Sequence, residues 1–267
     1  MSARAGAFAA LACAALAFAV LGTPARADDA VPLSSADVAA RWHGRLANAH
    51  FNATVRMQMD LGGLREERVM RVFRDDERGR NERVLIRFDA PADLRNVGLL
   101  YLEQTDRPND YFLYQPAMKR IRRLPQSIAD DDVYGIDLEF LGFGVAQSAP
   151  TEIVGMTSER LDGRAVYKLE ERASAPNPRF ELRRTWIDAQ SFVPLRTEHL
   201  RGDRVVLLAE TLEVVDVQGV TTPKRMRFHK PIEKREVLLS VDKVDYRAPI
   251  DEEHFSALAL LRSQAPK

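Results

Sequence analysis

The sequence of 267 residues predicts a mostly β fold of about eleven antiparallel strands, with a helix near each end. Three observations support this prediction. Short segments with apolar residues at every second position recur along the chain, which is the pattern of half-buried strands. Pro, Gly, Asn and Asp separate these segments, as expected for the turns of an antiparallel meander. No segment repeats the strand–helix–strand alternation that builds a parallel sheet.

The first 27 residues have the pattern of a secretory signal peptide. Arg4 precedes an apolar run, Ala5 to Leu21, and the small-x-small motif Ala25-Arg26-Ala27 follows it. We expect cleavage before Asp28, which leaves a single domain over 28–267. A transmembrane anchor is the alternative, but the run is short and rich in alanine. The one cysteine, Cys13, lies inside this run, so the mature chain has no thiol for a disulfide.

The charge of the mature chain is close to balanced. The full sequence has 39 basic and 39 acidic residues, and removing 1–27 takes away two arginines, which leaves 37 − 39 = −2. A basic excess typical of nucleic-acid binding is absent, and so is the charge excess of a disordered chain. With a signal peptide and no anchor, we expect a soluble periplasmic protein, and we predict that it is a monomer.

A helix begins the mature domain and a meander follows it. Ser34 and Asp37 have the spacing of a capping box, and Val38, Trp42, Leu46 and Ala49 form an apolar stripe of about four turns. Trp42 should anchor this helix on the sheet. Strands are then predicted over 51–61, 68–73, 83–88, 98–104 and from Tyr111 to Tyr114.

An irregular segment, 125–150, interrupts the meander. Neither the strand period nor the helix period fits it, and its aromatic and aliphatic content argues against disorder, so we interpret it as a functional loop or a lid. Strands resume over 152–161, 165–172, 183–188, 192–200, 205–217, 224–228 and 236–246. A short helix carrying Phe255, Leu258 and Leu261 should close the chain.

Several short motifs occur in an order that resembles a known family. They include Tyr111-Phe112-Leu113-Tyr114-Gln115-Pro116 with Lys119 to Arg123 after it, Arg87 to Pro91, Gly98 to Leu100, Trp186 to Asp188, Pro194 to Arg196 and Pro223 to Met226. Together they resemble the outer membrane lipoprotein-sorting proteins of the LolA/LolB-like superfamily, over roughly the whole mature chain. The segment Gly135 to Leu138 departs from the family pattern, because Ile136 replaces a hydroxyl residue and Leu138 an aromatic one.

The resemblance implies a fold and a function. The fold is an unclosed antiparallel β half-barrel with helices covering its concave face. The function is carriage of lipoprotein acyl chains through the periplasm, and related sequences are associated with RND-type lipid exporters. A carrier of this kind needs no sharp motif, because each buried methylene contributes about 0.8 kcal/mol without any polar contact.

Two groups of residues are candidates for such a site. Flexible methionines on predicted strands suit a surface that must fit more than one apolar shape. The candidates for an apolar cavity are Val55, Met57, Met59, Ile86, Phe88, Leu100, Phe112, Tyr114, Met118, Phe140, Trp186, Met226 and Phe228. The candidates for contact with a lipid headgroup or a partner are Lys119, Arg120, Arg122 and Arg123, which alternatively form only a solvated strand edge that discourages pairing.

Catalysis and metal binding find no support in the sequence. The five histidines, His43, His50, His199, His229 and His254, have no ligand spacing on a shared element. The run from Asp130 begins like a calcium loop, but Tyr134 and Leu141 occupy positions that need oxygen ligands. No nucleophile, phosphate or dinucleotide motif is present.

We therefore predict a periplasmic carrier of acyl chains, without a cofactor, that is not an enzyme. The alternative is a sensor or accessory subunit of an RND-type exporter, with the basic cluster as its docking surface.

Overall fold

The computed structural model describes residues 33–47, 49–61, 63–77, 80–125, 132–133, 136–137, 150–249 and 251–261. Residues 33–267 form one compact unit. Its elements are α1 (Ser35–Gly44), β1 (Phe51–Leu61), β2 (Arg65–Glu77), β3 (Arg80–Ala90), β4 (Gly98–Leu102), β5 (Asp110–Gln115), the 3-10 helix η1 (Pro116–Met118), β6 (Arg120–Leu124), β7 (Asp132–Val133), β8 (Ile136–Asp137), β9 (Thr151–Leu161), β10 (Arg164–Ala173), β11 (Leu182–Asp188), β12 (Pro194–Arg201), β13 (Arg204–Val217), β14 (Val220–Lys230), β15 (Arg235–Asp245), and the 3-10 helices η4 (Glu252–Phe255) and η5 (Ala257–Leu261).

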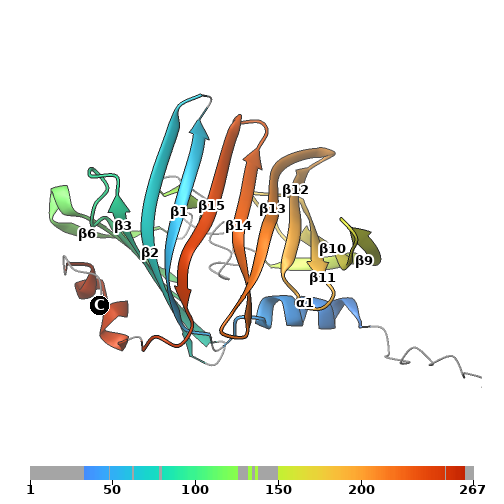
Figure 1. Ribbon diagram of the computed structural model, residues 1–267, viewed down its shortest axis with the longest axis horizontal. Helices are drawn as coiled ribbons and strands as arrows, with labels where there is room; N and C mark the ends of the chain where they lie inside the picture. Colours follow the sequence, from blue (N-terminus) through green and yellow to red (C-terminus); the bar gives the residue numbers. More distant parts are fainter. Residues whose placement is uncertain are drawn as a thin grey trace, which may run out of the picture. The chain divides into compact units, whose positions relative to one another are not determined.

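One antiparallel sheet of 13 strands contains nearly all of this structure (Figure 1). Its order is β6-β5-β4-β3-β2-β1-β15-β14-β13-β12-β11-β10-β9, and β7 and β8 form a separate pair. The first and last strands are therefore neighbours in the middle of the sheet. The outermost strands, β6 and β9, are not paired with each other, so the sheet does not close into a barrel.

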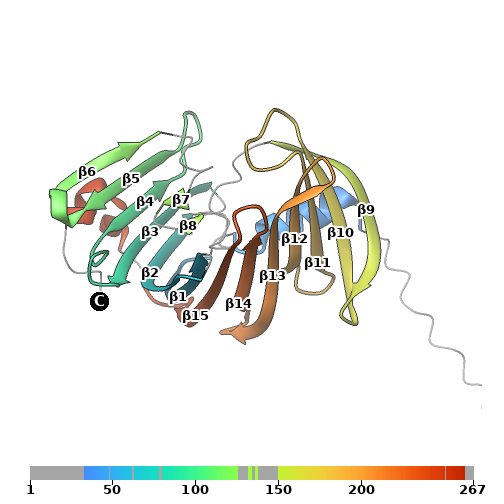
Figure 2. The same cartoon turned by 90° about the horizontal axis from the view of Figure 1, so that it is seen from above.

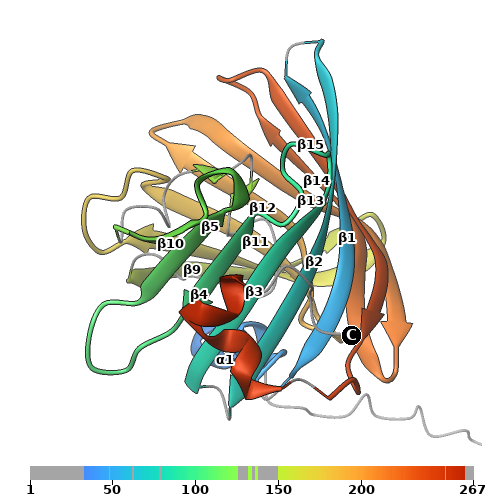
Figure 3. The ribbon, with the colours of Figure 1, turned by 90° about the vertical axis from the view of Figure 1, so that its left-hand side faces the viewer.

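The sheet is strongly bent, and its two faces carry different helices (Figures 2 and 3). Helix α1 lies on the concave face, against β9 and β10. The C-terminal 3-10 helices η4 and η5 lie on the convex face, against β3, β4, β5 and β6. This arrangement confirms the predicted half-barrel. It differs from the sequence-based expectation in that only the N-terminal helix is on the concave side.

Strict alternation in β1 sets the pattern for the faces. Ala53, Val55, Met57 and Met59 are buried and belong to one apolar cluster, while Gln58 between them is exposed. Arg56, on the outer face, pairs with Glu67 of β2 and with Asp242 of β15. Opposite the step from Thr54 to Val55, β15 has one extra residue, Asp242, and this β-bulge increases the local twist of β15 and bends it.

Helix α1 begins at the predicted cap. The Ser34 hydroxyl accepts a hydrogen bond from the Asp37 backbone N–H (3.1 Å), and the Asp37 carboxylate accepts one from the Ser34 backbone N–H (3.2 Å). Val38 and Trp42 then pack near Leu169 and Ile187, so Trp42 anchors the helix as predicted. The helix ends at Gly44, about one turn earlier than the apolar stripe predicted, and Leu46 instead joins the cluster beneath β1.

The C-terminal segment 251–261, which we call the strap, covers the convex face of β2 to β4. Phe255 and Leu260 of the strap form a buried cluster with Phe73, Leu85 and Leu100. Under the strap lies Arg87, whose Nη2 donates to the carbonyl of Ala259 at 2.6 Å. No helix in the described ranges is long and apolar enough to cross a membrane.

The strap requires a glycine beneath it. A Cβ added to Gly98 of β4 would lie 2.8 Å from Leu260 Cδ2, and Leu260 is fully buried. We therefore expect Gly98→Ala to lower the free energy of unfolding by about 1–3 kcal/mol, the usual cost of overpacking. Urea denaturation measures this change.

The matched control is Gly155→Ala on β9, where an added Cβ meets Glu170 Oε2 at an ordinary 3.5 Å and should change stability little. In a Leu260→Ala background, Gly98→Ala should cost much less. An equal cost in both backgrounds would contradict the proposed clash.

Candidate functional site: the concave apolar floor

The concave face carries a continuous apolar surface, which we call the floor. It extends over eight neighbouring strands, from β5 through β1 and β15 to β13. Its buried residues in the sheet are Phe51, Ala53, Val55, Met57, Met59, Met70, Val72, Val84, Ile86, Phe88, Leu99, Tyr101, Tyr111, Leu113, Leu207, Met226, Phe228, Val237, Leu239 and Val241.

The floor is long compared with an acyl chain. Eight strands at about 4.8 Å spacing give a width of about 34 Å. The acyl chains of one membrane leaflet span about 15 Å, half of the hydrocarbon core. In the described part of the chain, Leu46, Leu94 and Val97 also join this cluster from the connections beside the sheet. The dimensions and the chemistry of the floor therefore suit an apolar chain.

The structure brings seven of the predicted cavity residues together on this floor. They come from three strands near the middle of the sheet: Val55, Met57 and Met59 of β1, Ile86 and Phe88 of β3, and Met226 and Phe228 of β14. Cross-strand pairing explains the grouping, since Met59 faces Val237 of β15, which in turn faces Phe228. Phe140 lies outside the described residues.

Leu100, Phe112 and Tyr114 require a correction. The sequence predicted them in the cavity, but the structure places them on the convex face with Phe255 and Leu260. Strands β4 and β5 are apolar on both faces, because the floor covers one side and the strap the other. Alternation therefore could not show which face each residue joins, and Leu99, Tyr111 and Leu113 take the concave positions.

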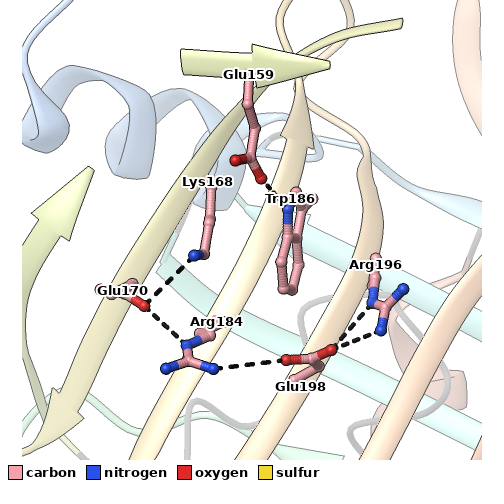
Figure 4. A network of polar contacts seen from close by, with 7 residues as sticks. All are labelled: Glu159, Lys168, Glu170, Arg184, Trp186, Arg196 and Glu198. Carbon is pink, nitrogen blue, oxygen red and sulfur yellow. Dashed lines mark hydrogen bonds and ion pairs between the residues drawn. The ribbon is translucent and has the colours of Figure 1, made fainter. Parts of the chain in front are cut away.

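Trp186 also lies on the convex face, in a network of charges (Figure 4). The indole N–H donates to Glu159, and the ring is flanked by Lys168 Nζ at 5.5 Å and Arg196 Cζ at 5.3 Å. A tryptophan needs an acceptor for its N–H, which the apolar floor does not supply. Its neighbours in β11, Thr185 and Ile187, occupy the concave side instead.

Met118 is the fifth predicted residue that lies away from the floor. It closes the 3-10 turn between β5 and β6, and 62% of its surface is exposed. The Pro116 in that turn begins a helical turn instead of continuing the strand.

The four basic residues at this edge divide into two groups. Arg123 faces the convex side and pairs with Asp110, which Arg107 also contacts at 2.5 Å. Hydrogen bonding from Arg107, with Arg123 beside it, holds the pKa of Asp110 below its usual value. Arg120 and Arg122 lie on the other face, where Arg122 is opposite Leu113 of the floor, and both are exposed. Only these two, with Lys119, are open to an outside contact.

Arg74 is a buried residue at one end of the floor that the sequence did not indicate. Its Nη1 donates to the carbonyls of Leu46 and Ala49, both at 2.8 Å, and its Nε donates to Glu82 at 2.5 Å. Burial raises the pKa of Glu82, and the adjacent Arg74 opposes that shift. Arg74 thus fixes the connection between α1 and β1 to the sheet.

A second buried ion pair lies beneath α1. Arg183 donates to both carboxylate oxygens of Glu171, at 2.9 and 3.0 Å, and its guanidinium lies between the rings of Trp42 (5.3 Å) and Phe180 (5.4 Å). The partners come from α1, β10, β11 and the segment before β11. This contact therefore docks the helix onto the concave face.

Removing Arg183 should be costly, because it leaves the Glu171 carboxylate buried without its counter-ion. We expect Arg183→Met to lower the free energy of unfolding by about 3–5 kcal/mol, measured by urea denaturation. The double variant Arg183→Met/Glu171→Met should recover most of that loss. Arg56→Met, which removes the surface ion pairs with Glu67 and Asp242, serves as the control and should cost about 1 kcal/mol or less. A small effect at Arg183 would show that the pair does not hold α1.

In the ranges that the structure describes, no group of three or more His, Cys, Asp or Glu side chains could hold a metal ion.

A protein-family model described as "Uncharacterized protein"-like matches residues 80–262, which is more than half of the chain. The chain belongs to this family. No curated protein shows significant sequence similarity to it.

Similar solved structures show which fold this chain has. A crystal structure of an outer membrane lipoprotein-sorting protein domain from Vibrio parahaemolyticus has a TM-score of 0.74 at 19% identity, covering 84% of this chain and 97% of the other. A DUF1329 family protein from Desulfovibrio piger gives 0.73 at 21% identity, covering 85% and 97%. A LolA superfamily protein from Nitrosomonas europaea gives 0.63 at 14% identity, covering 84% and 98%. The chain therefore has the fold of the LolA superfamily, as the sequence motifs predicted.

Proposed function

We propose that this protein is a periplasmic carrier that holds acyl chains of lipoproteins or other lipids on the apolar floor. The observation that carries the proposal is the floor itself, an apolar cluster that continues across eight strands with the buried Arg74–Glu82 pair at one end. One structural neighbour, the outer membrane lipoprotein-sorting protein domain from Vibrio parahaemolyticus, supports the same class of cargo.

The energetics favour such a cargo. About a dozen buried methylenes give roughly 10 kcal/mol of transfer free energy, which is comparable with the cost of association. Met57, Met59, Met70 and Met226 contribute flexible thioethers to the floor, so it can adapt to chains of different shape. No catalytic group is required for this function.

Export belongs to the same proposal. The predicted signal peptide would direct the chain to the periplasm, and cleavage before Asp28 would release a soluble domain. Native mass spectrometry of protein purified from its own host reports both the mature mass and any bound lipid. A protein that is consistently free of lipid would refute the carrier function.

A polar group on the floor should release the cargo. We expect Met57→Gln, which puts an amide in the middle of β1 on the concave face, to reduce lipid occupancy about tenfold. Native mass spectrometry measures occupancy as the ratio of loaded to empty protein.

Leu100→Gln is the matched control, since Leu100 is equally buried but packs under the strap on the convex face. It should lower stability in the same way and leave occupancy unchanged. Equal losses of lipid in both variants would mean that the floor is not the binding surface.

The exposed residues at the β6 edge of the sheet favour a second function, docking to a partner protein. Met118 is exposed next to Lys119, Arg120 and Arg122, and these three cations form no ion pair with the described residues. An exposed apolar side chain surrounded by cations suits docking to an acidic protein surface. We therefore infer, as the alternative, an accessory subunit of an RND-type envelope exporter.

Charge reversal separates the two functions. The variant Lys119→Glu/Arg120→Glu/Arg122→Glu should abolish co-purification with the exporter and leave lipid occupancy unchanged if this edge is a docking surface. The control Arg160→Glu/Arg164→Glu/Arg172→Glu reverses three cations of β9 and β10 at the opposite end of the sheet. Unchanged co-purification in the first variant would exclude docking at β6.

A further inference from the structure

The sheet opens between β14 and β15. These strands pair from Lys230 opposite Arg235 to Arg225 opposite Ser240, and their mutual pairing stops there. Beyond that point β14 stays paired with β13 as far as Val220, and β15 stays paired with β1 as far as Asp245. Figure 1 shows the two strands diverging toward the bottom of the view. We call this place the β14–β15 opening.

A pocket of about 440 Å³ occupies the opening. Four valines supply its apolar walls, Val215 and Val217 of β13 and Val241 and Val244 of β15. Its volume lies within the range of small-molecule sites, about 300–1,000 Å³. The pocket also adjoins the floor, because Val241 belongs to the floor cluster and Val244 packs against it.

The charged residues that line the pocket are two lysines and two aspartates. Asp242 is already bound to Arg56 (3.0 Å), and Asp245 accepts hydrogen bonds from Gln218 Nε2 and from the Arg247 backbone N–H, both at 2.9 Å. The two lysines that line the pocket, Lys224 and Lys243, form no ion pair with any residue that the structure describes. Both lysines are therefore available to a ligand. Of the two acids, Asp242 is neutralised by Arg56, and Asp245 keeps its charge because both of its donors are neutral groups.

A third cation, Arg45, does not line the pocket but contacts Thr221, the neighbour in sequence of the lining residue Thr222. The guanidinium of Arg45 is half-buried, and its Nη1 donates to the carbonyl of Thr221 at 3.2 Å. Across the described chain it has no carboxylate partner. Burial lowers the pKa of Arg45, while Tyr246 opposes this shift. Tyr246 itself joins the two strands through a hydroxyl contact of 2.9 Å with Thr222, which lines the pocket. A partly buried cation without a counter-ion is costly unless an anion arrives.

We propose that the β14–β15 opening binds the anionic head of an amphiphile, a carboxylate or a phosphate, while the apolar chain of that amphiphile lies along the floor. The inference rests on the proposed carrier function and names its substrate class. The apolar walls favour an amphiphile over a free anion, since inorganic phosphate would gain nothing from four valines. The three cations Arg45, Lys224 and Lys243 favour an anionic head over a neutral one.

The test compares two fluorescent ligands of equal chain length, a fatty acid and the corresponding fatty alcohol. Both are titrated into mature protein that has been stripped of lipid. Lys224→Glu/Lys243→Glu should weaken fatty-acid binding about tenfold and leave alcohol binding unchanged. The control Arg120→Glu/Arg122→Glu makes the same change of charge at the edge strand β6 and should alter neither affinity. Lys224→Gln/Lys243→Gln should give an intermediate loss if charge, and not a folding defect, is the cause.

The outcomes distinguish this inference from the function on which it rests. If neither ligand binds the unmodified protein, the carrier function fails. If both ligands bind and the lysine variants alter neither affinity, the carrier function stands and this inference is overturned. If only the β6 variant loses fatty-acid binding, the anionic head lies at β6, and the proposed site at the β14–β15 opening is also overturned. Inorganic phosphate should not displace the fatty acid, and displacement would indicate a site for small anions in place of an amphiphile.

Discussion

The pairing register of one continuous sheet determines everything else in this molecule. Successive side chains of a strand point to opposite faces, so a slip of one residue would exchange the two faces of that strand. Across eight strands the register keeps apolar residues together on the concave side. The β-bulges at Asp242 of β15 and at Leu212 of β13 each insert one residue into their strand, and the floor continues across both.

The two faces of the sheet differ in composition and in the elements that cover them. The concave face gathers apolar surface and receives one helix at its far end, held by the Arg183–Glu171 pair. The convex face is covered by the strap over β3 to β6, and over β9 to β12 it carries a network of charges around Trp186. A face that is charged stays soluble without a covering element, so the strap is needed only where the outer residues of β2 to β5 are apolar.

Much of this arrangement was predictable from the sequence, for local reasons. The alternation in β1 showed its inner face, and the Ser34–Asp37 pair showed where α1 begins. The ordered motifs led to the correct fold. Thirteen strands form the sheet where about eleven were predicted, and one strand absent from the predicted ranges is β6, which follows the 3-10 turn at Pro116–Met118.

Other features depend on partners far away in the sequence. The segment Gly98–Leu102 is apolar throughout, and only the strap, more than 150 residues later, decides that Leu100 faces outward. The sequence predicted Trp186 in the cavity, because it could not show that Glu159 of β9 accepts a hydrogen bond from the indole N–H. Nothing in the local sequence distinguishes Arg74 and Arg183 from other arginines. Their roles depend on backbone carbonyls and aromatic rings that lie next to them only in the folded chain. The head-binding cations at the β14–β15 opening were missed for the same reason.

The seam between β1 and β15 has a consequence for the order of events in folding. Every other neighbouring pair in the 13-stranded sheet joins strands that follow one another in the chain. A circular permutation that began at β9 and ended at β6 would place β15 directly before β1 in the chain. Every neighbouring pair of strands in the sheet would then be consecutive in sequence, as in a simple meander. In the natural order, the seam forms only after β15 has been synthesised, and non-local pairings of this kind are slow to form. Until then the β1–β6 half has an unpaired edge at β1, in the middle of what will become the floor.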